Sequence, residues 1–282
     1  MKTRVRRRRR VVAGAVVGVA VVVAVVAIAL SRVGTKTPRR QAAPSCTATA
    51  STGQATLALD QAANASTIAA VGKRDAMSDH AVTIALATAL QESRLMNLDY
   101  GDADSVGLFQ QRPSQGWGTP AQLLNPRYAA ASFYAALTKV AGWPDLEVTD
   151  AAQRVQRSAS PGAYAQWEPQ ARILAQALTG EVPAGFACRF TGFGSPTPSR
   201  QLGAAVAAEL GSRSVNVDVS EARGWTVASW LVAHAQTYQI DEVTFAGRRW
   251  TPSTGAWELR LPARMRVELR RVGIRAGAEL SS

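Results

Sequence analysis

Apolar residues recur at helical spacing through the middle of the chain. Between residues 56 and 180, several stretches have the length and the apolar periodicity of α-helices. The expected helices span residues 56–71, 79–96, 125–141, 150–157 and 164–178. The stretch 79–96 is apolar nearly all round, which predicts a helix buried at the centre of a domain. After it, residues 98–119 are rich in glycine and polar residues and predict a loop or a short hairpin.

The pattern changes after residue 200. Apolar and polar residues alternate there in short runs typical of strands, between two further helical stretches. We expect helices at residues 201–210 and 224–238, and strands at residues 215–219, 242–246, 256–261 and 265–272. Residues 31–55 and 189–200 lack apolar periodicity and predict linkers. The predicted fold class is α+β, with a mainly helical domain at residues 56–188 and a small α/β domain at residues 201–282.

The N-terminal part differs from both regions. Residues 1–10 form a basic tail, and residues 11–30 are apolar without a single charge. A helix of that length spans about 30 Å, the thickness of the hydrocarbon core of a bilayer. Seven basic residues precede the segment and four follow it, which places the N-terminus inside the cell. We expect a single-pass transmembrane helix in the lipid bilayer of the cytoplasmic membrane, with the C-terminal domains extracellular.

A cleaved signal peptide is the alternative for this segment. Ala27-Ile28-Ala29 has the form of a cleavage site. The apolar region of a signal peptide usually runs for about 7–15 residues, and the apolar run here is longer, which favours an uncleaved anchor. In both cases the rest of the protein is exported.

The charge of the chain is concentrated at its N-terminal end. The sequence holds 32 Lys and Arg against 20 Asp and Glu, a formal net charge of +12. Eleven of the basic residues lie within residues 1–45, which contain no acidic residue, so the remainder is close to neutral. A nucleic-acid binder needs basic charge spread over its folded surface. We therefore expect no nucleic-acid partner.

Two cysteines, Cys46 and Cys188, fall on the side predicted to be exported. In an oxidising compartment, two thiols without metal-ligand spacing indicate one disulfide. Two separate buried thiols are the alternative.

No sequence pattern points to a metal or a cofactor. The chain has only two histidines, His80 and His234, and no His/Cys/Asp cluster with zinc-ligand spacing. It has neither a glycine-rich phosphate loop nor a Gly-x-Ser-x-Gly nucleophile elbow. We expect no metal and no cofactor. His234 falls on an otherwise apolar helix, which favours a hydrogen-bonded histidine in the core over a ligand.

Glu92 lies near the end of the apolar helix 79–96. One, two and three helical turns back from it stand Thr88, Ala85 and Ala81, all small. A carboxyl group in this position has room for a ligand beside it and is partly desolvated, which favours the protonated acid. Cleavage of a glycosidic bond needs such an acid to protonate the leaving oxygen. A solvated charge at a helix end is the alternative.

The residues around Glu92 carry a resemblance to a known family. Glu92-Ser93 ends an apolar helix, an acidic stretch containing glycine follows, and Ser105-Val-Gly-Leu-Phe-Gln110 and Pro113 come next. This order resembles the lytic transglycosylases, which have a lysozyme-like fold. Downstream, Asn125-Pro126 before a helix and the segment 158–164 are similar to later elements of that family. The resemblance covers about residues 78–170 and implies that residues 56–188 form a lysozyme-like domain.

The resemblance also implies an activity. It makes Glu92 the catalytic acid and base, and the glycan strands of peptidoglycan the substrate. Ser105 and Gln110 are expected to shape the site or to touch the substrate. Tyr164 is expected either to stabilise a cationic transition state or to pack in the core. Three tryptophans could stack on sugar rings or pack in the protein: Trp117, Trp143 and Trp167.

A second carboxylate would decide the mechanism. A transglycosylase needs only one, because the 6-hydroxyl of the sugar attacks and leaves a 1,6-anhydro end. A hydrolase such as a muramidase needs another carboxylate, either to activate water or to act as nucleophile. Asp99, Asp102 and Asp104 are candidates for that role or for substrate binding. Aspartates beside glycine also cap turns, which is the alternative for Asp102 and Asp104.

Other functions remain open at this point. A non-catalytic wall-binding protein with the same fold is the main alternative, and a membrane scaffold that only binds partners is another. The segment 224–235, followed by a strand and by Gly247-x-x-Trp250, weakly resembles a small domain appended to exported actinobacterial cell-wall proteins. That domain is expected to bind or position the protein rather than to catalyse.

Overall fold

The computed structural model describes residues 43–193, 198–211, 219–260 and 268–271. These residues belong to one compact unit, Ala43–Ser282. The basic tail 1–10, the predicted transmembrane segment 11–30 and most of the predicted strand 215–219 lie outside the described residues. Within the described ranges, no helix has both the length and the apolar character needed to cross a bilayer.

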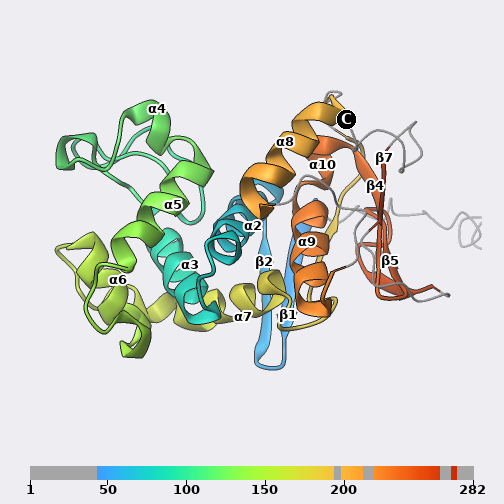
Figure 1. Ribbon diagram of the computed structural model, residues 1–282, viewed down its shortest axis with the longest axis horizontal. Helices are drawn as coiled ribbons and strands as arrows, with labels where there is room; N and C mark the ends of the chain where they lie inside the picture. The colour runs from blue at the N-terminus through green and yellow to red at the C-terminus, as the bar shows by residue number, and fades with distance from the viewer. Residues whose placement is uncertain (1–42, 194–197, 212–218, 261–267, 272–282) are drawn as a thin grey trace, which may run out of the picture. The chain divides into compact units, whose positions relative to one another are not determined.

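The helical region follows the apolar periodicity of the sequence (Figure 1). Its helices are α2 (Leu59–Arg74), α3 (Asp79–Ser93), α4 (Pro120–Leu123), α5 (Pro126–Leu137), α6 (Val148–Gln156) and α7 (Glu168–Thr179). Short 3₁₀ turns stand at η1 (Pro113–Gln115), η2 (Trp143–Asp145) and η3 (Ala165–Trp167). The five long helices predicted for this region are confirmed, with ends shifted by a few residues.

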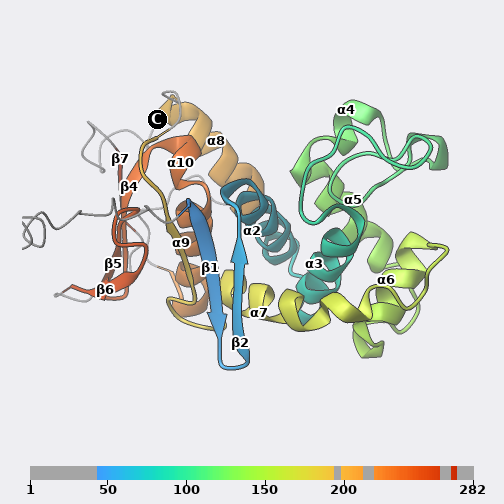
Figure 2. The same ribbon diagram turned by 180° about the vertical axis from the view of Figure 1, so that it is seen from behind.

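Helix α3 is the central helix of this region, as its all-round apolar sequence predicts. The Oγ atom of Ser78 caps its first turn by accepting a hydrogen bond from the backbone N–H of Ala81 at 3.2 Å. Nearly every residue from Ala81 to Leu90 is buried. The helix packs against α2, α5, α6 and α7, and it lies between α2 and α6 in both views (Figure 1, Figure 2).

A three-stranded sheet of order β2-β1-β3 packs beside α7. Its strands are β1 (Ser45–Ala50), β2 (Gly53–Leu57) and β3 (Phe186–Arg189). The predicted linker 31–55 is therefore wrong for residues 45–55, which form most of an antiparallel hairpin. The sequence signal is weak because the buried face of the hairpin uses small residues. Cys46, Ala48 and Ala50 point inward, and they alternate with threonines that resemble a polar stalk.

The disulfide between Cys46 and Cys188 is confirmed. The two residues stand directly opposite each other in the antiparallel pairing of β1 with β3, and both are fully buried. The bond spans a sequence separation of 142 residues. It therefore joins the start of the helical region to its end.

In the residues described after 198, the C-terminal region has three helices and a four-stranded antiparallel sheet of order β6-β5-β4-β7. Its elements are α8 (Ser199–Leu210), α9 (Glu221–Ala233), α10 (Ala235–Tyr238), β4 (Ile240–Phe245), β5 (Arg248–Trp250), β6 (Trp257–Leu259) and β7 (Glu268–Arg271). The predicted strands at 242–246, 256–261 and 265–272 are confirmed, whereas β5 is not predicted by the sequence pattern. A tight turn at Ala246 and Gly247, both with positive φ, joins β4 to β5.

The two predicted domains share one core. Helix α9 packs against α2 and α7 as well as against β4, and a single cluster of buried residues includes side chains from both regions. The indole Nε1 of Trp250 donates to the backbone oxygen of Cys188 at 3.0 Å. The indole Nε1 of Trp257 donates to the backbone oxygen of Phe186 at 2.8 Å. The segment 189–200 therefore does not separate two independent cores. The sequence could not show this, because α9 is apolar all round and matches either arrangement.

A buried polar cluster connects α2, α8 and α9. The Glu209 carboxylate accepts hydrogen bonds from the Thr67 hydroxyl at 2.8 Å and from Trp230 Nε1 at 2.7 Å. His234 stacks on the Trp230 ring, with 4.2 Å between the ring centroids, and its Nδ1 donates to the Trp230 backbone oxygen. His234 is thus a hydrogen-bonded core histidine, as its apolar helix predicts.

We expect the protein to lose stability as the pH falls below about 6.5, partly because of His234. Burial lowers the pKa of His234, although Glu209 and the Trp230 carbonyl oppose the change. The unfolded chain then takes up a proton at a higher pH than the folded protein, so acid favours unfolding. The free energy of unfolding should fall by up to about 1.4 kcal/mol per pH unit from this group.

Urea unfolding of the protein and of H234Q between pH 7 and pH 5 measures this effect. The variant should lose the part of the pH dependence that begins near pH 6.5, whatever its stability at pH 7. An identical pH dependence in both proteins would show that His234 does not contribute.

Candidate active site at the end of α3

Glu92 lies in the last turn of α3 and is partly exposed. The helix ends immediately after it, because Arg94 and Leu95 adopt left-handed backbone conformations with φ values of 56° and 61°. Two consecutive residues of this kind other than glycine are rare, and strained backbone of this type is often found at functional sites. The abrupt ending leaves the carboxyl group at the rim of the buried helix.

Tyr164 holds the Glu92 carboxyl group. Its hydroxyl donates a hydrogen bond to Glu92 Oε1 at 2.7 Å, across a sequence separation of 72 residues. The Tyr164 side chain is buried. Burial raises the pKa of Tyr164 well above its usual value, and the nearby Glu92 adds to the increase. The phenol is therefore a neutral donor at physiological pH. The structure thus brings together two of the site residues predicted from the sequence.

Trp167 forms a second contact with the end of α3. Its indole Nε1 donates to the side-chain oxygen of Gln91 at 2.7 Å. The guanidinium carbon of Arg94 lies 3.8 Å from the centre of the Trp167 ring, a cation–π arrangement. Gln91 and Arg94 flank Glu92 in the sequence, yet nothing in the pattern marks them as site residues, because their partner comes from η3.

Ser93 ties the same helix end to the loop that follows. Its hydroxyl donates to the backbone oxygen of Leu108 at 2.8 Å. That loop is anchored in the core, since the ring of Phe109 stacks on Phe133 with 4.8 Å between the centroids. A bridge between Val106 and Gln111 makes the loop a tight hairpin, which confirms the prediction for residues 98–119. Glu92 is therefore placed by a well-packed turn.

Ser105 and Gln110 lie within the bonding of this loop. Ser105 is buried, and the Gln110 side-chain amide donates to the backbone oxygens of Tyr100 and Gly107 at 3.3 and 3.2 Å. A Cβ atom at Gly101 would lie 2.7 Å from the backbone oxygen of Ser105, as well as 1.9 Å from Gln110 Oε1, so only glycine fits there. Ser105 and Gln110 thus stabilise this loop, in which the Tyr100 side chain is 68% exposed to solvent.

The two aspartates of the loop have different surroundings. The Asp104 carboxylate accepts hydrogen bonds from Arg112 Nε at 2.8 Å and from the backbone N–H and hydroxyl of Ser114. The Arg112 guanidinium, followed by the Ser114 backbone, lowers the pKa of Asp104 to about 2. The Asp104 carboxylate thus already accepts hydrogen bonds from donors of the same loop. Asp102 is exposed, and its backbone oxygen accepts from the N–H of Ser105.

Among the residues that the structure describes, no three His, Cys, Asp or Glu side chains are grouped so that they could hold a metal ion. The described residues of the site therefore offer a carboxyl group, a phenol, and neighbouring amide and guanidinium groups.

No protein-family model matches the sequence, and no curated protein is significantly similar to it. The candidate site accordingly stands on its geometry and on the resemblance of its motifs.

If the chain has the glycan-cleaving activity that the resemblance implies, Y164F should lower kcat by about ten- to a hundred-fold, because a hydrogen bond to the carboxylate that forms as Glu92 gives up its proton contributes about 1.5–3 kcal/mol. KM should change little, since the ring remains in place. Y134F is the matched control, because Tyr134 is also buried and its hydroxyl donates to Ile68 O at 3.0 Å. Equal losses of kcat in the two variants would contradict a specific role for the Tyr164 hydroxyl.

Proposed function

We propose that the protein cleaves the glycan strands of peptidoglycan, with Glu92 as the general acid and base. The observation that carries this proposal is the hydrogen bond between the buried, neutral Tyr164 phenol and the Glu92 carboxyl group at the end of a buried helix. A buried donor of this kind fixes one carboxyl oxygen in place. The other oxygen, Oε2, is then the one available to exchange a proton with a substrate.

The proposed reaction needs a proton donor that later becomes an acceptor. Protonated Glu92 gives its proton to the glycosidic oxygen as the bond from that oxygen to C1 of the sugar breaks. The 6-hydroxyl of the same sugar then attacks C1 and returns its proton to Glu92. The products are one strand with a new hydroxyl end and one with a 1,6-anhydro end, and the enzyme is regenerated.

The surroundings of the aspartates favour transglycosylation over hydrolysis. A hydrolase needs a second carboxylate that is free to act on water or on the sugar. Three donors from Arg112 and Ser114 already engage Asp104, so it is a poor candidate for that task. Asp99 and Asp102 are both exposed and are the residues that would serve a muramidase.

The place of action follows from the sequence. A membrane anchor at residues 11–30 would hold the active site at the outer face of the cytoplasmic membrane, where peptidoglycan lies. The disulfide is consistent with export. A wall-binding protein without activity is the second candidate, and it differs from the first in releasing no product.

Product analysis tests the proposed function. The full-length protein in detergent is incubated with purified peptidoglycan, and the soluble fragments are separated and weighed by mass spectrometry. Fragments with 1,6-anhydro ends are expected, whereas reducing ends would assign the protein as a muramidase. Binding to the peptidoglycan pellet without any released fragment, over a range of pH and salt, would leave only the wall-binding function.

A further inference from the structure

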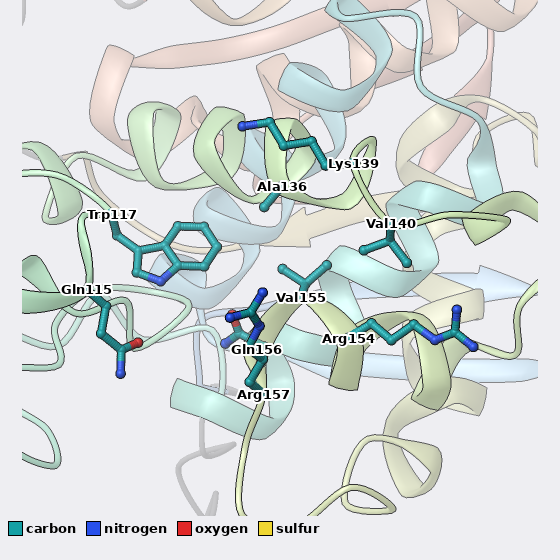
Figure 3. A pocket seen from close by; sticks show the side chains of 9 residues that line it. All are labelled: Gln115, Trp117, Ala136, Lys139, Val140, Arg154, Val155, Gln156 and Arg157. Atoms are coloured by element: carbon teal, nitrogen blue, oxygen red, sulfur yellow. The ribbon is translucent and has the colours of Figure 1, made fainter.

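A cavity of about 610 Å³ lies between α5, α6 and the turn η1. Figure 3 shows the side chains that line it. The polar ones come from η1 and the loop after it, the turn after α5 and the end of α6. They include three cations, two amides and an indole ring. These residues are Gln115, Trp117, Lys139, Arg154, Gln156 and Arg157. A cavity of this volume is within the range of small-molecule and peptide-fragment sites.

The lining of the cavity is positively charged. It contains Lys139, Arg154 and Arg157 but no acidic residue. In the described part of the chain, none of these three side chains forms an ion pair. Arg154 Nη1 is within 3.4 Å of the Ala141 backbone oxygen. The cavity therefore offers unneutralised cationic donors to an anion.

The positions of the side chains favour a ligand that is more than a simple ion. In Figure 3 the Arg157 guanidinium points into the space between Trp117 and Val155, while Arg154 points away from Trp117. A carboxylate that meets Arg157 would therefore lie close to a flat apolar ring. Gln115 adds an amide, which can both donate to and accept from a peptide group.

The cavity is connected to the candidate active site by short links. Gln156 Nε2 donates to the Phe109 backbone oxygen at 2.8 Å, next to Leu108, which accepts from Ser93. Arg157 ends α6 in a left-handed conformation, with a φ of 54°. The side chain of the next residue, Ser158, opposes the rise in the pKa of Tyr164. Arg157, which lines the cavity, is thus the direct sequence neighbour of a partner of the Glu92–Tyr164 pair.

We propose that this cavity binds the carboxylate-bearing peptide attached to the glycan strand. The inference rests on the proposed function, because it names the part of the peptidoglycan substrate that occupies this place. The free carboxylates of the peptide would pair with Arg157 and Lys139, and arginine is suited to such pairing because its planar fork can bind a carboxylate through two hydrogen bonds. Trp117 would cover the apolar parts of the peptide.

Binding to two matched probes tests the inference. A muramyl tripeptide with free carboxylates and the same compound with amidated carboxylates are titrated calorimetrically into the full-length protein. The acid form should bind at least about ten-fold more tightly. R157Q and K139Q should each remove most of this difference, whereas R157K should keep part of it. R200Q, an exposed arginine on α8 outside the cavity lining, is the control and should change nothing.

The outcomes separate this inference from the proposed function. Equal affinity for the two probes, or affinities that R157Q and K139Q leave unchanged, would overturn the peptide site even if glycan strands are cleaved. Selective binding of the acid form would support it even if no cleavage is found. Tighter binding of an oligomeric glycerol phosphate than of the acid probe, lost in R157Q, would assign the cavity to a phosphate-bearing wall polymer and overturn the proposal.

Discussion

Glycan cleavage should fall by about a hundred- to ten-thousand-fold or more when Glu92 is replaced by glutamine. The amide has nearly the same shape and can still accept the hydrogen bond from the Tyr164 hydroxyl through its oxygen. It cannot donate a proton to the glycosidic oxygen, and general acid catalysis typically contributes rate factors of about 10² to 10⁴. The loss should therefore appear in kcat, with fold and substrate binding retained. Rates of fragment release at saturating peptidoglycan measure it.

Two matched variants make the Glu92 experiment specific. E147Q makes the same chemical change at an exposed residue before α6, whose side chain caps nothing, and it should keep full activity. D99N and D102N test for a second carboxylate, and both should also stay active if the protein is a transglycosylase. Full activity in E92Q would refute the catalytic assignment, whereas loss of activity in E92Q together with D99N or D102N would favour hydrolysis.

Loss of the disulfide should have the second large effect. Opening the link between Cys46 and Cys188 frees a loop with a sequence separation of 142 residues in the unfolded chain. Loop-closure entropy sets the stabilisation at about 5 kcal/mol at most. Single domains are typically stable by about 5–15 kcal/mol, so the double variant C46A/C188A should unfold at a much lower denaturant concentration. Denaturant titration followed by circular dichroism measures the change.

The reduced protein provides the control for this prediction. If the bond itself is the cause, reduction of the unmodified protein should shift its unfolding midpoint to that of the double variant. A midpoint that stays in place after complete reduction, verified by alkylation and mass, would show that the pairing of β1 with β3 is stable without the bond.

The apolar periodicity predicted the parts of the fold that depend on local pattern. Helix α3 is buried on all sides, as its sequence indicates, and the alternating strands after residue 240 form a sheet. The hairpin of β1 and β2 was not predicted, because its inward positions hold alanine and cysteine, which carry little hydrophobic signal. The shared core was not predicted either. Whether α9 covers its own sheet or also α2 depends on contacts between distant segments, which a local pattern does not encode.

The residues of the candidate site also divide into those that the local pattern predicts and those that depend on contacts between distant segments. Glu92 could be found from its place at the end of an apolar helix, since that position depends only on nearby residues. Its bond to Tyr164 and the bond from Trp167 to Gln91 join residues more than 70 positions apart, and no spacing rule predicts them. The engagement of Asp104 by Arg112 and Ser114 is local but depends on how the loop turns.

The pairing of β1 with β3 also determines how the protein would carry a mechanical load. Ser45 and Arg189 are partners in this ladder, next to the disulfide, so the chain enters and leaves the helical region at one point. In the arrangement proposed above, tension between an N-terminus held in the membrane and a C-terminal part bound to the wall would pass through the covalent sulfur–sulfur bond. The chain between Cys46 and Cys188, which holds Glu92 and Tyr164, would lie outside that path, and the geometry of the site would be less exposed to the strain of a growing or swelling envelope.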